Sequence, residues 1–279
     1  MAGIDPDEQA RRRAAGSFAA GDPLGWFEPL YAAAQKGEAV VPWDRGTAHP
    51  MLVAWAQAHQ LSGGGRALVV GCGPGYDAEY VAGLGFDTVA FDIAASAVRA
   101  ARERFPGSQV EYRTADLLDP PADWREAFDL VVESYTVQAL PDPPRRDAIT
   151  SVGRMVGLGG TLIVIALARG EHEDPGQGPP WPLTRAEIEA FAVPGVQPVR
   201  IEKVRDPTVA PRWRAEFRRP ARAGDDLAGG ESRAGPVSGP GQRDLRCRAR
   251  PGTSASCWGV IWSPVDADHH VPGRVMPGP

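Results

Sequence analysis

Three glycines, spaced two residues apart, follow a short apolar run and are the first candidate for chemistry in this sequence. The run ALVV (67–70) is continuously apolar, as in a buried parallel strand, and Gly71, Gly73 and Gly75 follow it directly. Glycine allows left-handed backbone and a close approach of the chain to a ligand. Asp92 ends the next apolar run, where its carboxylate can accept hydrogen bonds from two ribose hydroxyls. The pattern predicts a site for a nucleotide-like cofactor.

Two cofactor templates compete for this turn. The form G-x-G-x-G fits residues 71–75 and is typical of S-adenosylmethionine sites, whereas the dinucleotide form G-x-G-x-x-[GA] fits residues 73–78. The strand is expected to end at Val70, so the dinucleotide frame would begin two residues late. It would also place Pro74, which has no N–H, in the turn that faces a pyrophosphate. The register therefore favours S-adenosylmethionine, with an NAD(P)-dependent oxidoreductase as the alternative.

A second acidic residue follows the third expected strand. Asp116, in the stretch TADLLDP, is placed to accept a hydrogen bond from an adenine amino group. The competing interpretation is a turn or helix-capping residue. The glycine turn, Asp92 and Asp116, in this order and each at a strand end, are more specific together than separately.

Alternating apolar runs and helical stripes position these residues. Strands are expected at 67–70, 88–91, 110–114, 128–133 and 161–167, followed by an antiparallel pair at 199–204 and 212–219. Pro50 should begin a helix, Asp142 and Pro143 should cap and begin another, and Thr184 with Glu187 should form a capping box. The predicted fold is α/β: a Rossmann-like, doubly wound, seven-stranded sheet in an α/β/α sandwich, mostly parallel with a C-terminal antiparallel strand. Ligands of such sheets bind beyond the carboxyl ends of the strands.

Composition divides the chain into three parts. Residues 1–22 are polar and alanine-rich and are expected to be a flexible N-terminus. Residues 23–219 form the domain, in which 23–62 supply an N-terminal lid and a helix. Residues 220–279 hold 18 Gly and Pro among 60 and no sustained period, so they are expected to be a disordered or aberrant tail that the fold does not require.

The bulk properties exclude several classes of protein. The net charge of −5 gives no reason to expect nucleic acid, and no apolar stretch reaches the length of a membrane span. Three scattered cysteines and the lack of a signal-peptide pattern favour a cytoplasmic setting. The stretches EHED (171–174) and DADHH (266–270) are interpreted as solvated charge, so no metal is expected.

The chain resembles class I S-adenosylmethionine-dependent methyltransferases, and it is most similar to their thiopurine/thiol methyltransferase-like branch. The resemblance covers roughly residues 23–219. It is carried by VPWDRGTAHP (41–50), ALVVGCGPGYDAEYVAGLGFDTVAFDIAASAV (67–98), TADLLDP (114–120), FDLVVESYTVQALP (128–141) and GLGGTLIVIA (157–166). It implies these cofactor-binding residues: Trp43, Gly71, Cys72, Gly73, Gly75, Asp92, Ile93, Asp116, Leu117 and Glu133. Thiopurine enzymes have an arginine-containing stretch where this chain has Ser134-Tyr135-Thr136, so no substrate contact is carried over from it.

The expected activity is methyl transfer from S-adenosylmethionine to a small-molecule acceptor, such as a thiol or a related nucleophile. This reaction is an in-line displacement that depends mainly on positioning, and a base is needed only if the acceptor must lose a proton. The sequence therefore names no catalytic residue. Trp26 and Phe27 are equally compatible with a lid and with core packing. Cys72 is expected to be a small turn residue. Asp44, Arg45 and His49 are candidates for contact with an acceptor, and for His49 a structural role is favoured.

Overall fold

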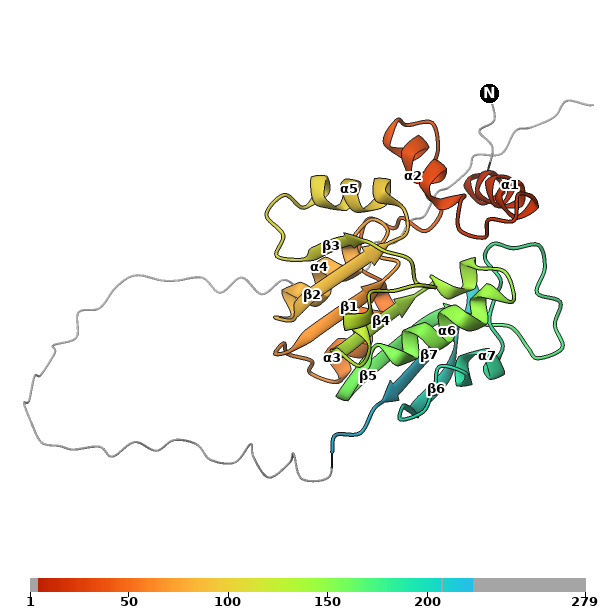
Figure 1. Ribbon diagram of the computed structural model, residues 1–279. Coiled ribbons are helices and arrows are strands. Elements are labelled where there is room, and N and C mark those ends of the chain that lie inside the picture. The colour runs from red at the N-terminus through yellow and green to blue at the C-terminus, as the bar shows by residue number, and fades with distance from the viewer. Residues whose placement is uncertain (1–4, 207, 223–279) are drawn as a thin grey trace, which may run out of the picture. The chain divides into compact units, whose positions relative to one another are not determined.

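A seven-stranded sheet in the order β3-β2-β1-β4-β5-β7-β6 forms the centre of the protein. The structure is a computed structural model that describes residues 5–206 and 208–222 (Figure 1). The strands are β1 (Arg66–Val70), β2 (Asp87–Asp92), β3 (Glu111–Thr114), β4 (Phe128–Ser134), β5 (Val156–Leu167), β6 (Gln197–Asp206) and β7 (Val209–Arg218). Strands β1 to β5 pair in parallel, and β7 runs antiparallel to both β5 and β6. The predicted doubly wound, mostly parallel sheet is confirmed.

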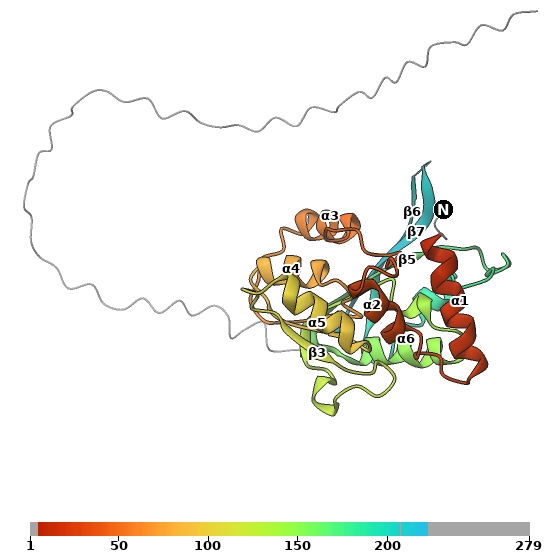
Figure 2. The ribbon, with the colours of Figure 1, turned by 90° about the horizontal axis from the view of Figure 1, so that it is seen from above.

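Helices cover both faces of this sheet (Figures 1 and 2). They are α1 (Pro6–Ala19), α2 (Phe27–Gln35), α3 (Pro50–Ala58), α4 (Tyr76–Gly83), α5 (Ala95–Arg104), α6 (Pro144–Arg154) and α7 (Arg185–Glu189), with short 3-10 turns η1 (Ala122–Trp124) and η2 (Val137–Ala139). One apolar cluster joins α3, α4 and α5 to one face, and a second joins α6 and α7 to the other. The sandwich is therefore α/β/α, as expected.

Strand β1 shows why its apolar run is unbroken. Ala67 and Val69 belong to the cluster under α3, α4 and α5, whereas Leu68 and Val70 belong to the cluster under α6 and α7. Successive side chains of a strand point to opposite faces, so a strand buried on both sides needs an apolar residue at every position. This burial on both faces continues to the end of β1, where the glycine turn begins.

The N-terminal segment differs from the prediction of a flexible residue 1–22 stretch. Residues 6–19 form helix α1, which is capped by the Asp5 side chain and has proline in its first turn. Ala10 and Ala14, one helical turn apart, are buried in a third apolar cluster with Trp26 and Leu30. Alanine is too small to give a strong periodic signal among charged neighbours, which is why the sequence pattern concealed this packed face.

Helix starts account for three further expectations. The capping box of Thr184 and Glu187 is present, and the Nδ1 of His49 caps α3, which confirms its structural role. Helix α6 begins one residue later than expected: the Asp142 carboxylate accepts from Arg146 instead of capping, so Pro143 stands at the cap.

The expected tail from residue 223 onward, with its DADHH cluster, lies outside the described residues.

Candidate functional site

The turn between β1 and α4 requires its glycines. Gly71, Gly73 and Gly75 have φ angles of 58°, 46° and 92°, in the left-handed region that side chains other than glycine rarely adopt. A Cβ atom at Gly73 would lie 2.7 Å from the Tyr31 hydroxyl, too close for any real contact. The backbone angles and the close packing therefore both require glycine in this turn, and its backbone stays at the carboxyl end of β1.

Asp92 ties the glycine turn to the end of β2. Its carboxylate accepts hydrogen bonds from the backbone N–H of Gly73 at 3.0 Å and of Ala94 at 2.9 Å. The residue is only 6% exposed, and this burial raises the pKa of its carboxyl group to about 6, while the two N–H donors lower it. A carboxylate offers about four lone-pair sites, so it retains capacity for further donors from a ligand.

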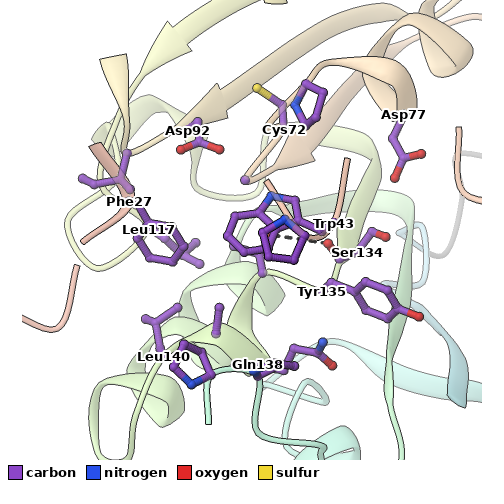
Figure 3. Close-up of a pocket in the computed structure, with 18 of the residues that line it drawn as sticks. Phe27, Trp43, Cys72, Asp77, Asp92, Leu117, Ser134, Tyr135, Gln138 and Leu140 are labelled. Atoms are coloured by element: carbon purple, nitrogen blue, oxygen red, sulfur yellow. Dashed lines mark hydrogen bonds between the residues drawn. The ribbon is translucent and has the colours of Figure 1, made fainter. Parts of the chain in front are cut away.

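A cavity of about 280 Å³ opens beside this turn. Asp92, Phe27 and Leu117 lie on one side, Asp77, Ser134 and Tyr135 lie on the other, and Trp43 stands between them (Figure 3). The cavity lies where β1, β2 and β4 end, which is the place that the doubly wound topology predicts for a ligand.

Aromatic side chains from the N-terminal segment wall this cavity. The indole N–H of Trp43 donates to the Tyr31 hydroxyl at 2.8 Å, and Trp26 stacks on Phe27 with 4.0 Å between ring centroids. Trp26 is almost fully buried, yet all four residues also contribute to the cavity lining. These aromatic residues therefore pack in the core and also line the cavity.

Most of the predicted site residues meet at this cavity. Its lining includes Trp43, Gly71, Cys72, Asp92, Ile93, Asp116 and Leu117. The lining does not include Gly73 or Gly75, which shape the turn. The Asp116 carboxylate also accepts from the Leu118 N–H at 2.8 Å, so both interpretations of this residue, ligand contact and turn, are compatible with its position. Cys72 is buried and its thiol pKa is raised by burial, which fits a small turn residue.

Glu133 is placed differently from the prediction, because it does not line the cavity. It is fully buried, and its carboxylate accepts from the backbone N–H of Thr136 at 2.8 Å and of Val137 at 3.0 Å. Side chains alternate along β4, so its neighbour Ser134 faces the cavity instead. Burial raises the pKa of the Glu133 carboxyl group to about 7. Glu133 stabilises the turn after β4 through these two hydrogen bonds, and among the described residues its Oε2 atom has no hydrogen-bond partner.

The structure adds Asp77, Tyr135 and Arg212, which the sequence did not single out as site residues. Arg45, Asp77, Tyr135 and Arg212 line the end of the cavity away from Asp92, together with the capping residue His49. Arg212 reaches this end because β7 pairs antiparallel with β5 in a register that sets it opposite Leu167, the last residue of β5. The alternating pattern of RWRAEFRR was the available signal, but it could not fix this register.

Within residues 5–206 and 208–222, no helix is long and apolar enough to cross a membrane. No group of three metal-ligating side chains comes together in that same part, which includes EHED at 171–174.

Comparison with known proteins agrees with this geometry. A family model described as a methyltransferase domain matches residues 67–160. Thiocyanate methyltransferase 1 of Brassica oleracea is 31% identical over 170 residues, which cover 60% of this chain and 73% of that protein. A probable thiol methyltransferase 2 of Arabidopsis thaliana is 29% identical over 156 residues, 55% of this chain and 67% of that protein.

Solved structures support the fold. The 1,6-didemethyltoxoflavin-N1-methyltransferase of Burkholderia thailandensis, solved with S-adenosylhomocysteine, aligns with a TM-score of 0.53 at 14% identity and covers 79% of this chain and 93% of its own. The oxidoreductase alternative gains no support from any of these relatives. Fold, glycine turn and sequence likeness lead to one conclusion: the chain belongs to the class I S-adenosylmethionine-dependent methyltransferases, near their thiol methyltransferase branch.

Proposed function

We propose that this cavity binds S-adenosylmethionine at its Asp92 end and a small nucleophile, of the thiol or thiocyanate type, at its Tyr135 end. The observation that carries the proposal is the buried Asp92 carboxylate, held by the glycine turn and open to further donors. Ribose hydroxyls fit this group, because two more hydrogen bonds to the charged form would offset the desolvation that raises its pKa.

The neighbouring residues would supply the remaining contacts to the cofactor. Ile93 and Leu117 supply apolar surface for an adenine ring, and the Asp116 carboxylate supplies an acceptor for its amino group. Trp43 covers the turn, so its ring face is available to a sulfonium cation. In this arrangement Gly71 and Cys72 contribute backbone that a ligand can approach closely.

The role of the protein in this reaction is to position the two reactants and to exclude water from the site. When bound, S-adenosylmethionine supplies an electrophilic methyl group whose carbon–sulfur bond breaks, its electron pair leaving on sulfur, as a lone pair of the acceptor forms the new bond. Holding two reactants in line in a closed site removes most of the entropy of bringing them together. The aromatic wall of Trp26, Phe27 and Trp43 closes one side of this site.

The class of acceptor is suggested by the relatives, which are named for thiocyanate and thiols. Such nucleophiles react from sulfur and are ionised, or readily ionised, at neutral pH. A dedicated base is then unnecessary, which is consistent with a site in which positioning groups outnumber candidate bases.

Two measurements test the proposal. Calorimetry should detect binding of S-adenosylhomocysteine but not of NAD, and the variant Asp87→Asn, at the exposed start of the same strand β2, should bind like the unmodified protein. Labelled methyl transfer should then be measured on a panel of thiols, thiocyanate, halides and small phenols. Tight binding of NAD, or failure to bind S-adenosylhomocysteine, would contradict the proposal.

A further inference from the structure

Four side chains at the Tyr135 end of the cavity form a cluster that cofactor binding leaves unexplained. Arg45 lies in the loop before α3, His49 caps α3, Tyr135 follows β4, and Arg212 lies on β7. They come from three separate parts of the chain, namely the segment before α3, the end of β4 and strand β7, and they converge on one end of one cavity. We refer to Arg45, His49, Tyr135 and Arg212 as the acceptor cluster.

Tyr135 organises this cluster. Its backbone has φ 65°, a left-handed conformation that is strained for a residue with a side chain and that often marks a functional site. Its hydroxyl accepts a hydrogen bond from the Nε of Arg212. The Arg45 guanidinium lies over its ring, with Cζ 4.9 Å from the centroid, and the His49 ring meets it edge-on at 5.2 Å. The Tyr135 side chain therefore contacts both guanidinium groups and the imidazole ring of His49.

Among the described residues, no ion pair neutralises either of the two guanidinium groups. Within the part of the chain that the structure describes, neither Arg45 nor Arg212 has a carboxylate within 4.0 Å. Asp77 lines the same end of the cavity and interacts electrostatically with Arg45, and its carboxylate accepts from the His49 backbone N–H at 2.6 Å and from the Ser134 hydroxyl. Two positive charges against one negative charge leave this end of the cavity positive.

His49 adds a hydrogen-bond donor of fixed direction. Its Nδ1 accepts from the Met51 backbone N–H at 3.1 Å, so a neutral ring must carry its proton on Nε2. Burial, followed by the charges of Arg45 and Arg212, lowers the pKa of His49 to about 3, so the ring is neutral at physiological pH. The residue is 5% exposed, and its Nε2 atom is buried with no hydrogen-bond partner in the part of the chain that the structure describes. An unpaired buried donor is costly, and a ligand that accepts from it would remove that cost.

We propose that Arg45, Arg212 and the Nε2–H of His49 form the acceptor subsite, and that they select a small anion as the nucleophile. This inference rests on the proposed function and specifies its second substrate. The subsite supplies two charged donors and one neutral donor, and His49 has no free lone pair with which to remove a proton. An anionic acceptor needs no such step: its lone pair forms the bond to the methyl carbon, the carbon–sulfur bond breaks toward sulfur, and both products are uncharged at the reacting atoms.

The test compares an anionic with a neutral acceptor in matched variants. Thiocyanate serves as the anionic probe and a neutral phenol as the comparison. Arg212→Gln and Arg45→Gln remove one charge each, and Arg218→Gln removes the same charge from an exposed site on the same strand as Arg212. His49→Asn removes the Nε2–H but keeps a side-chain oxygen that can cap α3, so stability should be retained.

We expect the KM for thiocyanate to rise about tenfold or more in Arg212→Gln and Arg45→Gln, because hydrogen bonds to charged groups have this strength. The turnover number should fall less, because the charge of the anion is already dispersed in the transition state, so these residues bind the ground state better. His49→Asn should raise the KM several-fold at an unchanged melting temperature. Arg218→Gln should match the unmodified protein, and none of the variants should alter the affinity for S-adenosylhomocysteine.

Two results would overturn the subsite. One is methylation of the phenol by a protein for which thiocyanate is neither a substrate nor a ligand. The other is an unchanged KM for thiocyanate in both arginine variants. Failure to bind S-adenosylhomocysteine would instead contradict the proposed function. Calorimetric titration of thiocyanate into the cofactor-free protein and into Arg212→Gln would then still decide whether the anion binds at this cluster.

Discussion

The exchange Asp92→Asn tests the cofactor site at its most constrained group. The carboxylate accepts from the backbone N–H of Gly73 and of Ala94, and the proposed ribose contact would add two hydroxyl donors. Loss of the charge should weaken binding of S-adenosylhomocysteine by about 2–4 kcal/mol, since hydrogen bonds to a charged acceptor contribute about 1.5–3 kcal/mol each. That loss corresponds to an increase in Kd of about 30-fold or more.

The same exchange also affects the free protein, which the assay must separate from binding. An asparagine amide turns one NH₂ group toward a backbone N–H, so the cofactor-free variant should unfold at a lower temperature. Titration calorimetry should therefore be run well below the melting temperature of the variant, with Asp87→Asn as the control at the exposed end of the same strand. A folded Asp92→Asn protein that binds S-adenosylhomocysteine with unchanged affinity would refute the assignment of Asp92.

Binding of S-adenosylhomocysteine near pH 6 should release protons from the unmodified protein but not from Asp92→Asn. Hydrogen bonds from the ligand would lower the pKa of the Asp92 carboxyl group from about 6. Calorimetry in buffers of different ionisation enthalpy measures the number of protons released. Burial raises the Glu133 pKa from 4.5 to about 7, so the folded state binds more protons than the unfolded state in that window and stability falls as pH rises through it. Urea unfolding at pH 5 and pH 8 should show a smaller fall in Glu133→Gln, and an equal fall in both proteins would contradict the role of Glu133. Trp43→Ala should weaken binding of S-adenosylhomocysteine more than it lowers the melting temperature of the free protein, whereas equal losses in the free and bound forms would indicate core packing alone.

The cofactor half of the site could be predicted from sequence because its parts are local. The glycine turn follows β1 directly and Asp92 is the last residue of β2, so each position is set by the end of an apolar run. Glu133 shows the limit of this reasoning. It stands next to Ser134 at the end of β4, and only the pleat of the strand decides which of the two faces the cavity. A motif that spans both residues cannot make that distinction.

The sequence pointed to Arg45 and His49 as possible acceptor contacts, but the proposed acceptor subsite as a whole could not be predicted, because tertiary contacts assemble it. Arg212 reaches the cavity through the antiparallel register of β7 on β5, and Arg45 reaches it through a loop packed on Tyr135. A shift of register by one residue would turn Arg212 to the opposite face of the sheet. No local pattern in RWRAEFRR specifies that register, so the position of this charge depends on the folded sheet.

Asp77 connects the two halves. It lies in the first turn of α4, directly after the glycine turn, and its carboxylate accepts the backbone N–H of His49. This hydrogen bond fixes the N-cap of α3, and with it the Nε2–H of His49, relative to the glycine turn. The methyl donor is proposed to bind beside that turn. In-line transfer is sensitive to displacements of about 1 Å. Asp77, a half-buried residue between the two proposed subsites, therefore helps to keep the distance between the donor and the acceptor constant.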